Sequence, residues 1–238
     1  MSRIYALITL CITLLLPAFG HASEASVRQA FLARFPGATI EGITRMPVGG
    51  LYEVVFEGQI VYTDEKVTYI MSGNLFDLRG STERNVTRER AMQLAAQTLA
   101  KSQDGAIKRV KGNGKRVLYT FEDPNCGYCK ELQKELVKVN DVTIYTFLWP
   151  ILSPDSVDKS KAIWCSKDRV RAWDEAMTKG TTAGAARKDC DTPLEKNAQL
   201  AQRFGIRGTP AIYLANGQQI GGYVPADKIE QALNTPSR

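Results

Sequence analysis

Histidine is almost absent from this sequence, and its scarcity limits the chemistry available to the chain. The 238 residues include one histidine and five cysteines. The histidine, His21, and one cysteine, Cys11, both lie within the first 22 residues, a segment that we predict to be cleaved. Without that segment the chain could form no Ser-His-Asp or Cys-His nucleophile, no histidine-ligated metal site and no histidine proton shuttle.

Long hydrophobic runs are missing after the N-terminus. Arg3 precedes the apolar run Ile4 to Leu16, and small residues lie before Ser23. This pattern predicts a secretory signal peptide over residues 1–22. No later run approaches the roughly 20 apolar residues that span a bilayer. We therefore expect an exported product without membrane insertion after cleavage, in which four cysteines favour disulfides over metal.

A strong charge of one sign is also lacking. The formal net charge is +6 with 24% charged residues, which is ordinary for a protein surface. No basic run is interleaved with aromatic residues, so the sequence does not indicate nucleic-acid binding.

Residues 23–82 have the pattern of a small α+β domain. A short amphipathic helix is predicted at Ser26–Phe35, followed by short strand-like segments. A region of this size buries little surface alone, so we expect it to pack on the rest of the chain or on a second copy. The predicted strands are Leu51–Phe56, Ile60–Thr63, Val67–Met71 and Leu75–Leu78.

A linker helix is predicted within residues 83–106, capped by Asn85 or Thr87. The α/β pattern of residues 107–238 begins with strands 107–111 and 116–121, which we expect to form a hairpin. A helix and the apolar strand 142–148 complete a predicted βαβ unit. Helices follow over residues 155–204, then a hairpin around Asn216-Gly217 and a last helix after Pro225.

The motif Cys126-Gly127-Tyr128-Cys129 carries the most chemical information. Cys126 is predicted where a strand gives way to a helix, and there free N–H groups and the helix dipole favour the thiolate. Cys129 follows nearly one helical turn later, so it could break a mixed disulfide formed by Cys126. Two other interpretations stay open: a zinc site if Cys165 and Cys190 converge on the pair, and an inert disulfide that closes a short loop.

Gly208-Thr209-Pro210 precedes the apolar strand Ala211–Leu214. A proline at this position is either an ordinary edge residue or a cis-proline. The cis form would expose the backbone of Thr209 beside the active sulfur, where a substrate strand could pair with it.

Three segments together resemble the DsbC-type periplasmic disulfide isomerases of the DsbC/DsbG family. They are the Cys126–Cys129 motif after Phe121-Glu122-Asp123, the segment Lys161–Asp168 around Cys165, and Gly208–Ala211. The resemblance implies a V-shaped homodimer without a cofactor or metal. Each protomer would have a cystatin-like dimerisation domain at 23–82, a linker helix at 83–106, and a thioredoxin-fold domain at 107–238 with a helical insertion at about 155–204.

The resemblance also assigns roles to individual residues. It implies a nucleophilic Cys126, a resolving Cys129, substrate-binding roles for Thr209, cis-Pro210, Gly127 and Tyr128, a structural disulfide between Cys165 and Cys190, and Gly58 in an edge strand at the dimer interface.

The implied activity is rearrangement of non-native disulfides in misfolded exported proteins in the periplasm, together with chaperone activity. A membrane thiol reductase of the DsbD type would keep the active pair reduced. Two alternatives remain: a DsbG-like reductase of oxidised cysteines, although that branch usually has proline where Gly127 stands, and a non-enzymatic periplasmic chaperone.

One position departs from thioredoxins and DsbA-type oxidases. Those proteins place an acid six residues before the first cysteine, where it handles the proton of the resolving thiol, whereas Thr120 occupies that position here. DsbC-type proteins lack that acid as well. We expect the nearby Glu122 and Asp123 to be solvated beyond the strand end, which leaves the proton acceptor for Cys129 unassigned.

Overall fold

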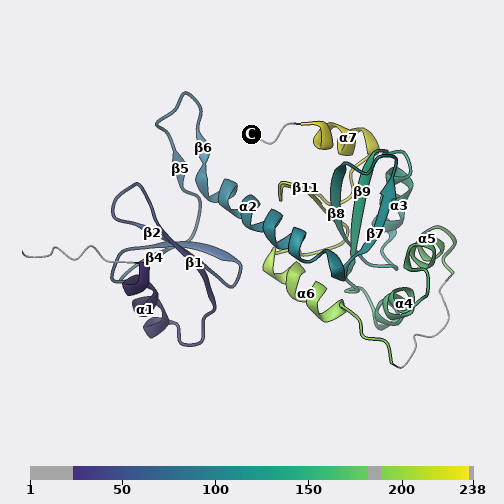
Figure 1. The fold of residues 1–238 in the computed structure, drawn as a ribbon, viewed down its shortest axis with the longest axis horizontal. Coiled ribbons are helices and arrows are strands. Elements are labelled where there is room, and N and C mark those ends of the chain that lie inside the picture. The colour runs from purple at the N-terminus through teal and green to yellow at the C-terminus, as the bar shows by residue number, and fades with distance from the viewer. Residues whose placement is uncertain (1–23, 182–188, 236–238) are drawn as a thin grey trace, which may run out of the picture.

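The computed structural model describes residues 24–181 and 189–235. The predicted signal peptide lies outside the described residues. The described chain folds into two lobes connected by a long helix (Figure 1). None of its described helices is both long and apolar enough to cross a membrane.

The N-terminal lobe is a four-stranded antiparallel sheet in the order β1-β2-β3-β4, covered by helix α1. The buried ring of Phe31 on α1 lies 5.1 Å from the ring of Phe56, centroid to centroid. This arrangement confirms the predicted α+β pattern. The elements are α1 (Glu24–Arg34), β1 (Ile40–Arg45), β2 (Tyr52–Phe56), β3 (Gln59–Thr63) and β4 (Ile70–Met71).

The third predicted strand is shorter than expected, because β4 keeps only its last two residues. The Asp64 carboxylate accepts hydrogen bonds from the backbone N–H groups of Thr68 and Tyr69, at 2.8 Å each. Val67, which lies between Asp64 and Thr68 in the chain, has a φ of +53°. These bonds hold a turn where the sequence pattern favoured a strand.

Helix α2 (Val86–Lys101) connects the lobes. Its N-cap is Asn85, one of the two predicted caps, whose side-chain oxygen accepts a hydrogen bond from the Arg88 N–H at 2.9 Å. Before the helix, β5 (Phe76–Asp77) and β6 (Arg84–Asn85) form a short hairpin that projects from the N-terminal lobe (Figure 1). Strand β6 was not predicted.

The second lobe contains a five-stranded mixed sheet in the order β11-β10-β8-β9-β7. The central strands β8 and β9 are parallel and are connected through helix α3, which confirms the predicted βαβ unit. The elements are β7 (Ile107–Lys111), β8 (Arg116–Glu122), α3 (Gly127–Leu136), β9 (Val142–Leu148), β10 (Ala211–Leu214), β11 (Gln219–Gly221) and α7 (Ala226–Asn234).

The predicted hairpin between β7 and β8 is wrong. Lys111 at the end of β7 and Arg116 at the start of β8 both lie opposite Val142, the first residue of β9. Strand β9 therefore lies between them, and the turn crosses over its end. Every residue of β9 is buried, and pairing along both edges satisfies its backbone groups.

The two faces of this sheet are covered by different helices, as the two-residue period of a strand requires. Leu118 of β8 packs with residues of α3 and α7. Its neighbours Tyr119 and Phe121 point to the other face and pack with Leu99 of α2 and Leu200 of α6. Even-numbered positions of β8 therefore face α3.

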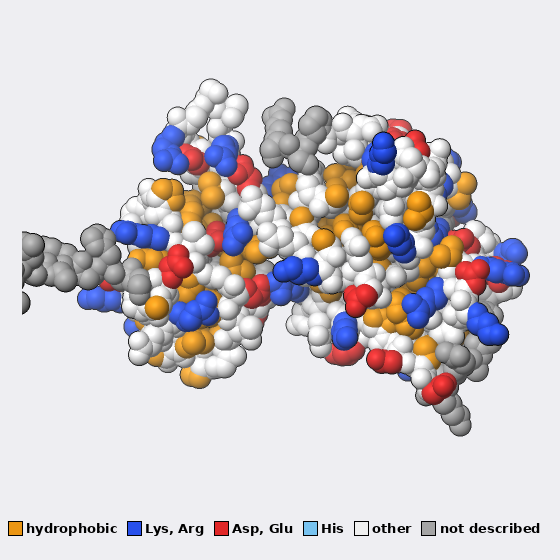
Figure 2. Space-filling model, in the orientation of Figure 1, with side chains coloured by type: hydrophobic (Ala, Val, Ile, Leu, Met, Phe, Trp, Pro, Cys, Tyr) orange, Lys and Arg blue, Asp and Glu red, His pale blue; other side chains and the backbone are white. Residues whose placement is uncertain are grey.

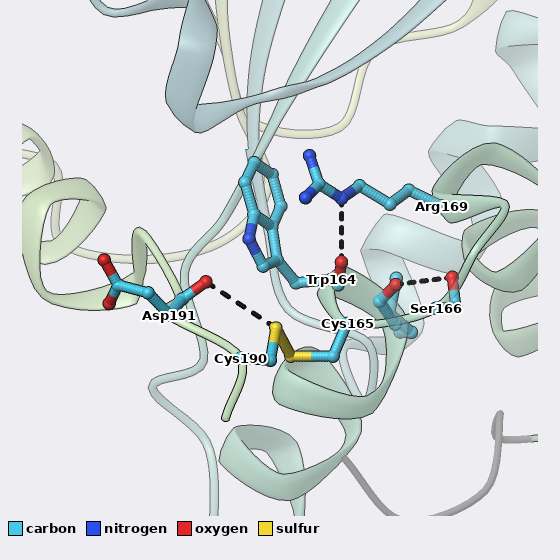
Figure 3. Close-up of a disulfide and its surroundings, with 7 residues drawn as sticks. Trp164, Cys165, Ser166, Arg169, Cys190 and Asp191 are labelled. Carbon is cyan, nitrogen blue, oxygen red and sulfur yellow. Dashed lines mark hydrogen bonds between the residues drawn. A yellow bond between two sulfur atoms is a disulfide. The ribbon is translucent and has the colours of Figure 1, made fainter. Parts of the chain in front are cut away.

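The described residues between β9 and β10 form three helices: α4 (Pro154–Trp164), α5 (Arg169–Lys179) and α6 (Leu194–Arg203). The structure joins Cys165, at the end of α4, to Cys190 by a disulfide (Figure 3). The Arg169 guanidinium lies 3.7 Å from the centre of the Trp164 ring and donates a hydrogen bond to the Trp164 carbonyl (Figure 3). The stacked pair fixes the start of α5 against the end of α4, whereas the disulfide ties the segment before α6 to the end of α4.

The lobes meet at a narrow junction (Figure 2). Gly58 was expected in an edge strand, but it lies in the turn between β2 and β3, whereas β1 and β4 are the edges of that sheet. The Gly58 N–H donates a hydrogen bond to the Glu41 carboxylate at 2.8 Å, and Glu41 also forms an ion pair with Arg203 of α6. Gly58 therefore faces the second lobe.

The hairpin between β10 and β11 touches the backbone of α2. Gly217 has a φ of +81°, and a Cβ there would lie 2.0 Å from the Met92 carbonyl oxygen. Only a residue without a side chain permits this contact between the linker helix and the sheet.

We predict that Gly217→Ala lowers stability more than Gly205→Ala. Both residues have positive φ, but a Cβ at Gly205 would meet nothing within 4 Å. Gly205→Ala should therefore show only backbone strain of about 1–2 kcal/mol, whereas Gly217→Ala should lose a further ~1–3 kcal/mol through overpacking. Urea unfolding followed by tryptophan fluorescence measures both, and equal losses would show that the contact between hairpin and helix is unimportant.

Candidate active site

Cys126 lies at the junction between β8 and α3. It is the N-cap of α3, directly before the first helical residue, Gly127. Its thiol donates a hydrogen bond to the Thr209 carbonyl oxygen at 3.3 Å, and 7% of the residue is exposed. The unpaired N–H groups and the positive end of the helix dipole of α3 therefore lie at this residue.

Cys129 lies one turn further along α3 and is completely buried. Both cysteines are free thiols in the structure. Burial raises the pKa of the Cys129 thiol, the nearby Glu122 carboxylate raises it further, and a hydrogen bond with the Asp123 backbone opposes them. The two sulfurs therefore differ in depth, and the deeper one is held as a thiol.

The Thr209-Pro210 peptide bond is cis, which selects one of the two forms considered for this proline. It lies directly before β10, where Ala211 is paired with Phe121 of β8. That pairing brings the Thr209 carbonyl to Cys126. The hydroxyl of Thr209 is buried without a hydrogen-bond partner among the described residues.

Exposed apolar side chains surround this point. Tyr128 is 68% exposed, and its ring lies 6.3 Å from that of Tyr223, centroid to centroid. Ile151 and Leu152, in the loop after β9, are exposed as well. Tyr128 is two residues after Cys126, and the loop of Ile151 and Leu152 is bonded to Asp123, three residues before it. We call these four residues the apolar rim.

The loop that carries Ile151 and Leu152 is held by Asp123. One oxygen of the Asp123 carboxylate accepts hydrogen bonds from the N–H groups of Ile151 and Leu152, at 2.8 and 3.0 Å. The other oxygen accepts one from the Asn125 N–H at 2.8 Å. Asp123 thus ties the apolar rim to the turn before Cys126.

The expectation that Glu122 and Asp123 are solvated is wrong, because both are completely buried. Asp123 is enclosed by the loop that it holds. Glu122 is the last residue of β8 and, like Leu118, has an even number in this strand, so its side chain points under α3. Gln133 of α3 donates hydrogen bonds to both of its oxygens, at 2.8 and 2.7 Å.

The alternative of a zinc site finds no support in this geometry. Cys165 and Cys190 are bonded to each other, so their sulfurs are not available to complete a site with Cys126 and Cys129. In the part of the chain that the structure describes, no group of three or more histidine, cysteine or acidic residues is placed to hold a metal.

Several residues of this site were missed from the sequence. Nothing local marks Ile151, Leu152 or Tyr223 as neighbours of Cys126, because chain segments far apart in the sequence bring them there. For Glu122 a signal did exist: the two-residue period of β8 places it on the face of Leu118. The sequence analysis assumed instead that the strand end was open to water.

Comparisons with known proteins match both lobes. Residues 18–88 match the family described as the disulfide bond isomerase protein N-terminal domain, and residues 103–236 match the thioredoxin-like domain family. A crystal structure of a disulfide interchange protein from Neisseria gonorrhoeae is similar with a TM-score of 0.52 and 41% sequence identity, covering 56% of this chain and 95% of that one.

Curated relatives extend the similarity over most of the chain. The probable thiol:disulfide interchange protein DsbC of Bordetella parapertussis is 43% identical over 209 residues, which is 87% of this chain and 73% of the relative. The thiol:disulfide interchange protein DsbC of Escherichia coli K12 is 29% identical over 220 residues, covering 91% and 89%. With its two matching domains and these relatives, the chain belongs to the DsbC family of thiol:disulfide interchange proteins.

Proposed function

We propose that this disulfide isomerase acts through Cys126 as nucleophile and Cys129 as resolving thiol. The observation that carries the assignment is the difference in depth between the two sulfurs. Cys126 faces the Thr209 carbonyl with part of its surface exposed, whereas Cys129 is buried behind it. A pair arranged in this way allows one sulfur to meet a substrate and the other to act only afterwards.

The reaction begins when the Cys126 thiolate attacks a non-native disulfide of a substrate. A bond forms between Cys126 and one substrate sulfur, the substrate disulfide breaks, and the other substrate sulfur leaves as a thiolate. That thiolate can then attack another disulfide of its own chain and free a new thiolate. The new thiolate attacks the substrate sulfur that is bonded to Cys126, Cys126 leaves as a thiolate, and the rearranged substrate is released without net oxidation or reduction.

Cys129 provides a second way to release the substrate from the mixed disulfide. Its thiolate attacks Cys126 and expels the substrate as a thiol, so that the substrate disulfide is reduced by two electrons and the Cys126–Cys129 disulfide is formed. Another round then needs a reductant. We propose a membrane thiol reductase of the DsbD type for that step.

The substrate would bind across Thr209, Pro210, Gly127 and Tyr128. Thr209 lies at the entrance to β10 beside the active sulfur, so its backbone can pair with an extended substrate segment. The apolar rim of Tyr128, Tyr223, Ile151 and Leu152 is exposed around it and suits the hydrophobic segments that misfolded proteins expose.

We place the activity in the periplasm, after removal of residues 1–22 as a signal peptide. The proposed division of the mature chain is a dimerisation domain at 23–82, a linker helix at 83–106 and a catalytic domain at 107–238. The disulfide between Cys165 and Cys190 would be structural, because it lies in the helical segment and apart from the two free thiols.

The proposed homodimer would form through the N-terminal lobe. Strand β4 is an edge of its sheet, and Ile70 and Met71 on it are 39% and 48% exposed. Phe76 and Leu78, from the adjoining hairpin segment, are exposed too. An apolar strand edge of this kind favours pairing with another chain. Two catalytic domains facing one cleft would account for the proposed chaperone activity.

Replacing the two cysteines separately tests the assignment. Cys126→Ser should reduce refolding of a scrambled, fully oxidised protein to the uncatalysed rate, because no mixed disulfide can form. Cys129→Ser should still isomerise but should accumulate mixed disulfides through Cys126, because no thiol at position 129 can attack the mixed disulfide and release the substrate. Mass spectrometry of acid-quenched samples detects these adducts.

Suppression of aggregation is the matched control. Cys126→Ser should still suppress aggregation of an unfolded protein, because a cleft that binds unfolded chains does not need the sulfur. Isomerisation that persists in Cys126→Ser would contradict the assignment. An unaltered protein that suppresses aggregation but does not speed isomerisation would identify a non-enzymatic chaperone.

Met71→Lys should convert the dimer to a monomer, because it places a charge on the apolar edge of β4. Light scattering coupled to gel filtration measures the mass. The monomer should still reduce small disulfides but should lose isomerisation of a scrambled protein. Val110→Lys is the control, because Val110 is 57% exposed on β7, the edge strand of the other sheet. A Met71→Lys protein that stays dimeric would refute this interface.

A further inference from the structure

Glu122 is a completely buried acid within a sheet that is otherwise mostly apolar on that face. Its carboxylate accepts a hydrogen bond from the Thr120 hydroxyl at 2.7 Å and two from the Gln133 amide. Thr120 in turn lies 3.1 Å from the Thr146 hydroxyl of β9. A buried charge is costly to maintain, so the presence of this cluster calls for a role.

The cluster lies under the active pair. Cys129 and Gln133 are four residues apart on α3, so they share one face of the helix, and both are buried. Gln133 bonds directly to Glu122, and the Glu122 carboxylate is close enough to Cys129 to raise the pKa of that thiol. The acid and the resolving cysteine thus occupy the same enclosed space between β8 and α3.

A chain of polar contacts leads from this space to the surface. Arg109 of β7 donates hydrogen bonds to the side-chain amide oxygen of Gln133 at 2.6 Å and to the Asp174 carboxylate of α5 at 3.1 Å. The Asp174 side chain is 49% exposed. Burial raises the pKa of Glu122, against the lowering effects of the Thr120 hydrogen bond and the Arg109 charge.

The resolving step needs a proton acceptor, because a thiol must become a thiolate before it attacks a disulfide. The other buried carboxylate at the site, Asp123, is bonded to backbone N–H groups of the loop that it holds, whereas the partners of Glu122 are the side chains of Thr120 and Gln133. Glu122 is the remaining carboxylate beneath Cys129 among the described residues. The charged or titratable groups that act on Glu122 are Cys129 of α3 and Arg109 of β7, whose ionic partner is Asp174 of α5.

We propose that Glu122 accepts the proton of Cys129 during the resolving step, an inference that rests on the proposed roles of Cys126 and Cys129. The proton passes from the Cys129 sulfur to a carboxylate oxygen of Glu122. The Cys129 thiolate forms a bond with the Cys126 sulfur, the bond between Cys126 and the substrate breaks, and the substrate thiolate takes a proton from water. Glu122 later returns its proton to solvent, or to Cys129 when the pair is reduced again.

A purely electrostatic role for Glu122 predicts the opposite outcome, which makes the proposal testable. A negative carboxylate disfavours the Cys129 thiolate. If charge were its only influence, Glu122→Gln would ease ionisation of Cys129 and speed the resolving step. If Glu122 accepts the proton, the same variant slows that step, by roughly 100-fold at the lower end of usual general-base effects.

The experiment mixes reduced protein with a fluorescent peptide disulfide and quenches with acid at intervals. Formation and decay of the Cys126 mixed disulfide are then measured separately by mass spectrometry. We expect Glu122→Gln to form the mixed disulfide at the normal rate and to lose it slowly, and Glu122→Asp to recover part of the decay rate. Glu131→Gln, which removes an exposed carboxylate from the same helix, should behave like the unaltered protein.

The pH dependence of mixed-disulfide decay distinguishes a proton acceptor from a Glu122 that has only a structural role. In the unaltered protein, decay should be slow while Glu122 is protonated and should rise as the pH passes its raised pKa. In Glu122→Gln this rise at acidic pH should disappear, and the decay rate of the mixed disulfide should follow the ionisation of the Cys129 thiol alone. The pH profile of the unaltered protein tests the proposal even if Glu122→Gln fails to fold. A decay rate that does not rise with pH in the acidic range would overturn the proposal.

Unchanged or faster decay in Glu122→Gln would also overturn the proposal while leaving the proposed function intact. Failure of the proposed function would look different, because the unaltered protein would then form no mixed disulfide at Cys126 at all.

Discussion

Strand β8 and helix α3 meet at a tight turn, and this junction places two sulfur atoms at different depths. Cys126 caps the helix and faces Thr209, whereas Cys129, one turn later, is enclosed between helix and sheet. The junction is fixed by long-range pairing, since β8 lies between β9 and β10 in the sheet. The pairing of β8 with β10 places the cis-proline turn beside the Cys126 sulfur. The strand pairing that forms the sheet of the second lobe therefore also assembles its active site.

Two buried acids next to each other in the chain serve this junction in different ways. Both oxygens of the Asp123 carboxylate accept hydrogen bonds from backbone N–H groups, so Asp123 holds the loop of Ile151 and Leu152 against the active turn. Glu122 points to the opposite side, under α3, where its partners are side chains. A buried polar network is costly unless it is fully hydrogen-bonded, and this one lies where the reaction must move a proton.

Much of the catalytic domain could be predicted from sequence because its signals are local. The cysteine spacing, the strand–helix–strand pattern and the Gly-Thr-Pro segment each depend on neighbouring residues. The errors arise where distant segments decide the outcome. The β7–β8 hairpin fails because β9 enters between the strands. Glu122 was misplaced because α3 covers the end of β8 and its Gln133 side chain bonds to the carboxylate. Gly58 was misplaced because Arg203, far along the chain, packs against its turn.

The difference in reactivity between the two thiols tests the account most directly. Reduced, folded protein is treated with a limiting amount of iodoacetamide, and the modified cysteines are identified by peptide mass mapping. The account predicts modification at Cys126, with Cys129 protected until the protein is unfolded. Modification of Cys129 at the same rate as Cys126, or before it, would contradict the unequal depth on which the mechanism rests.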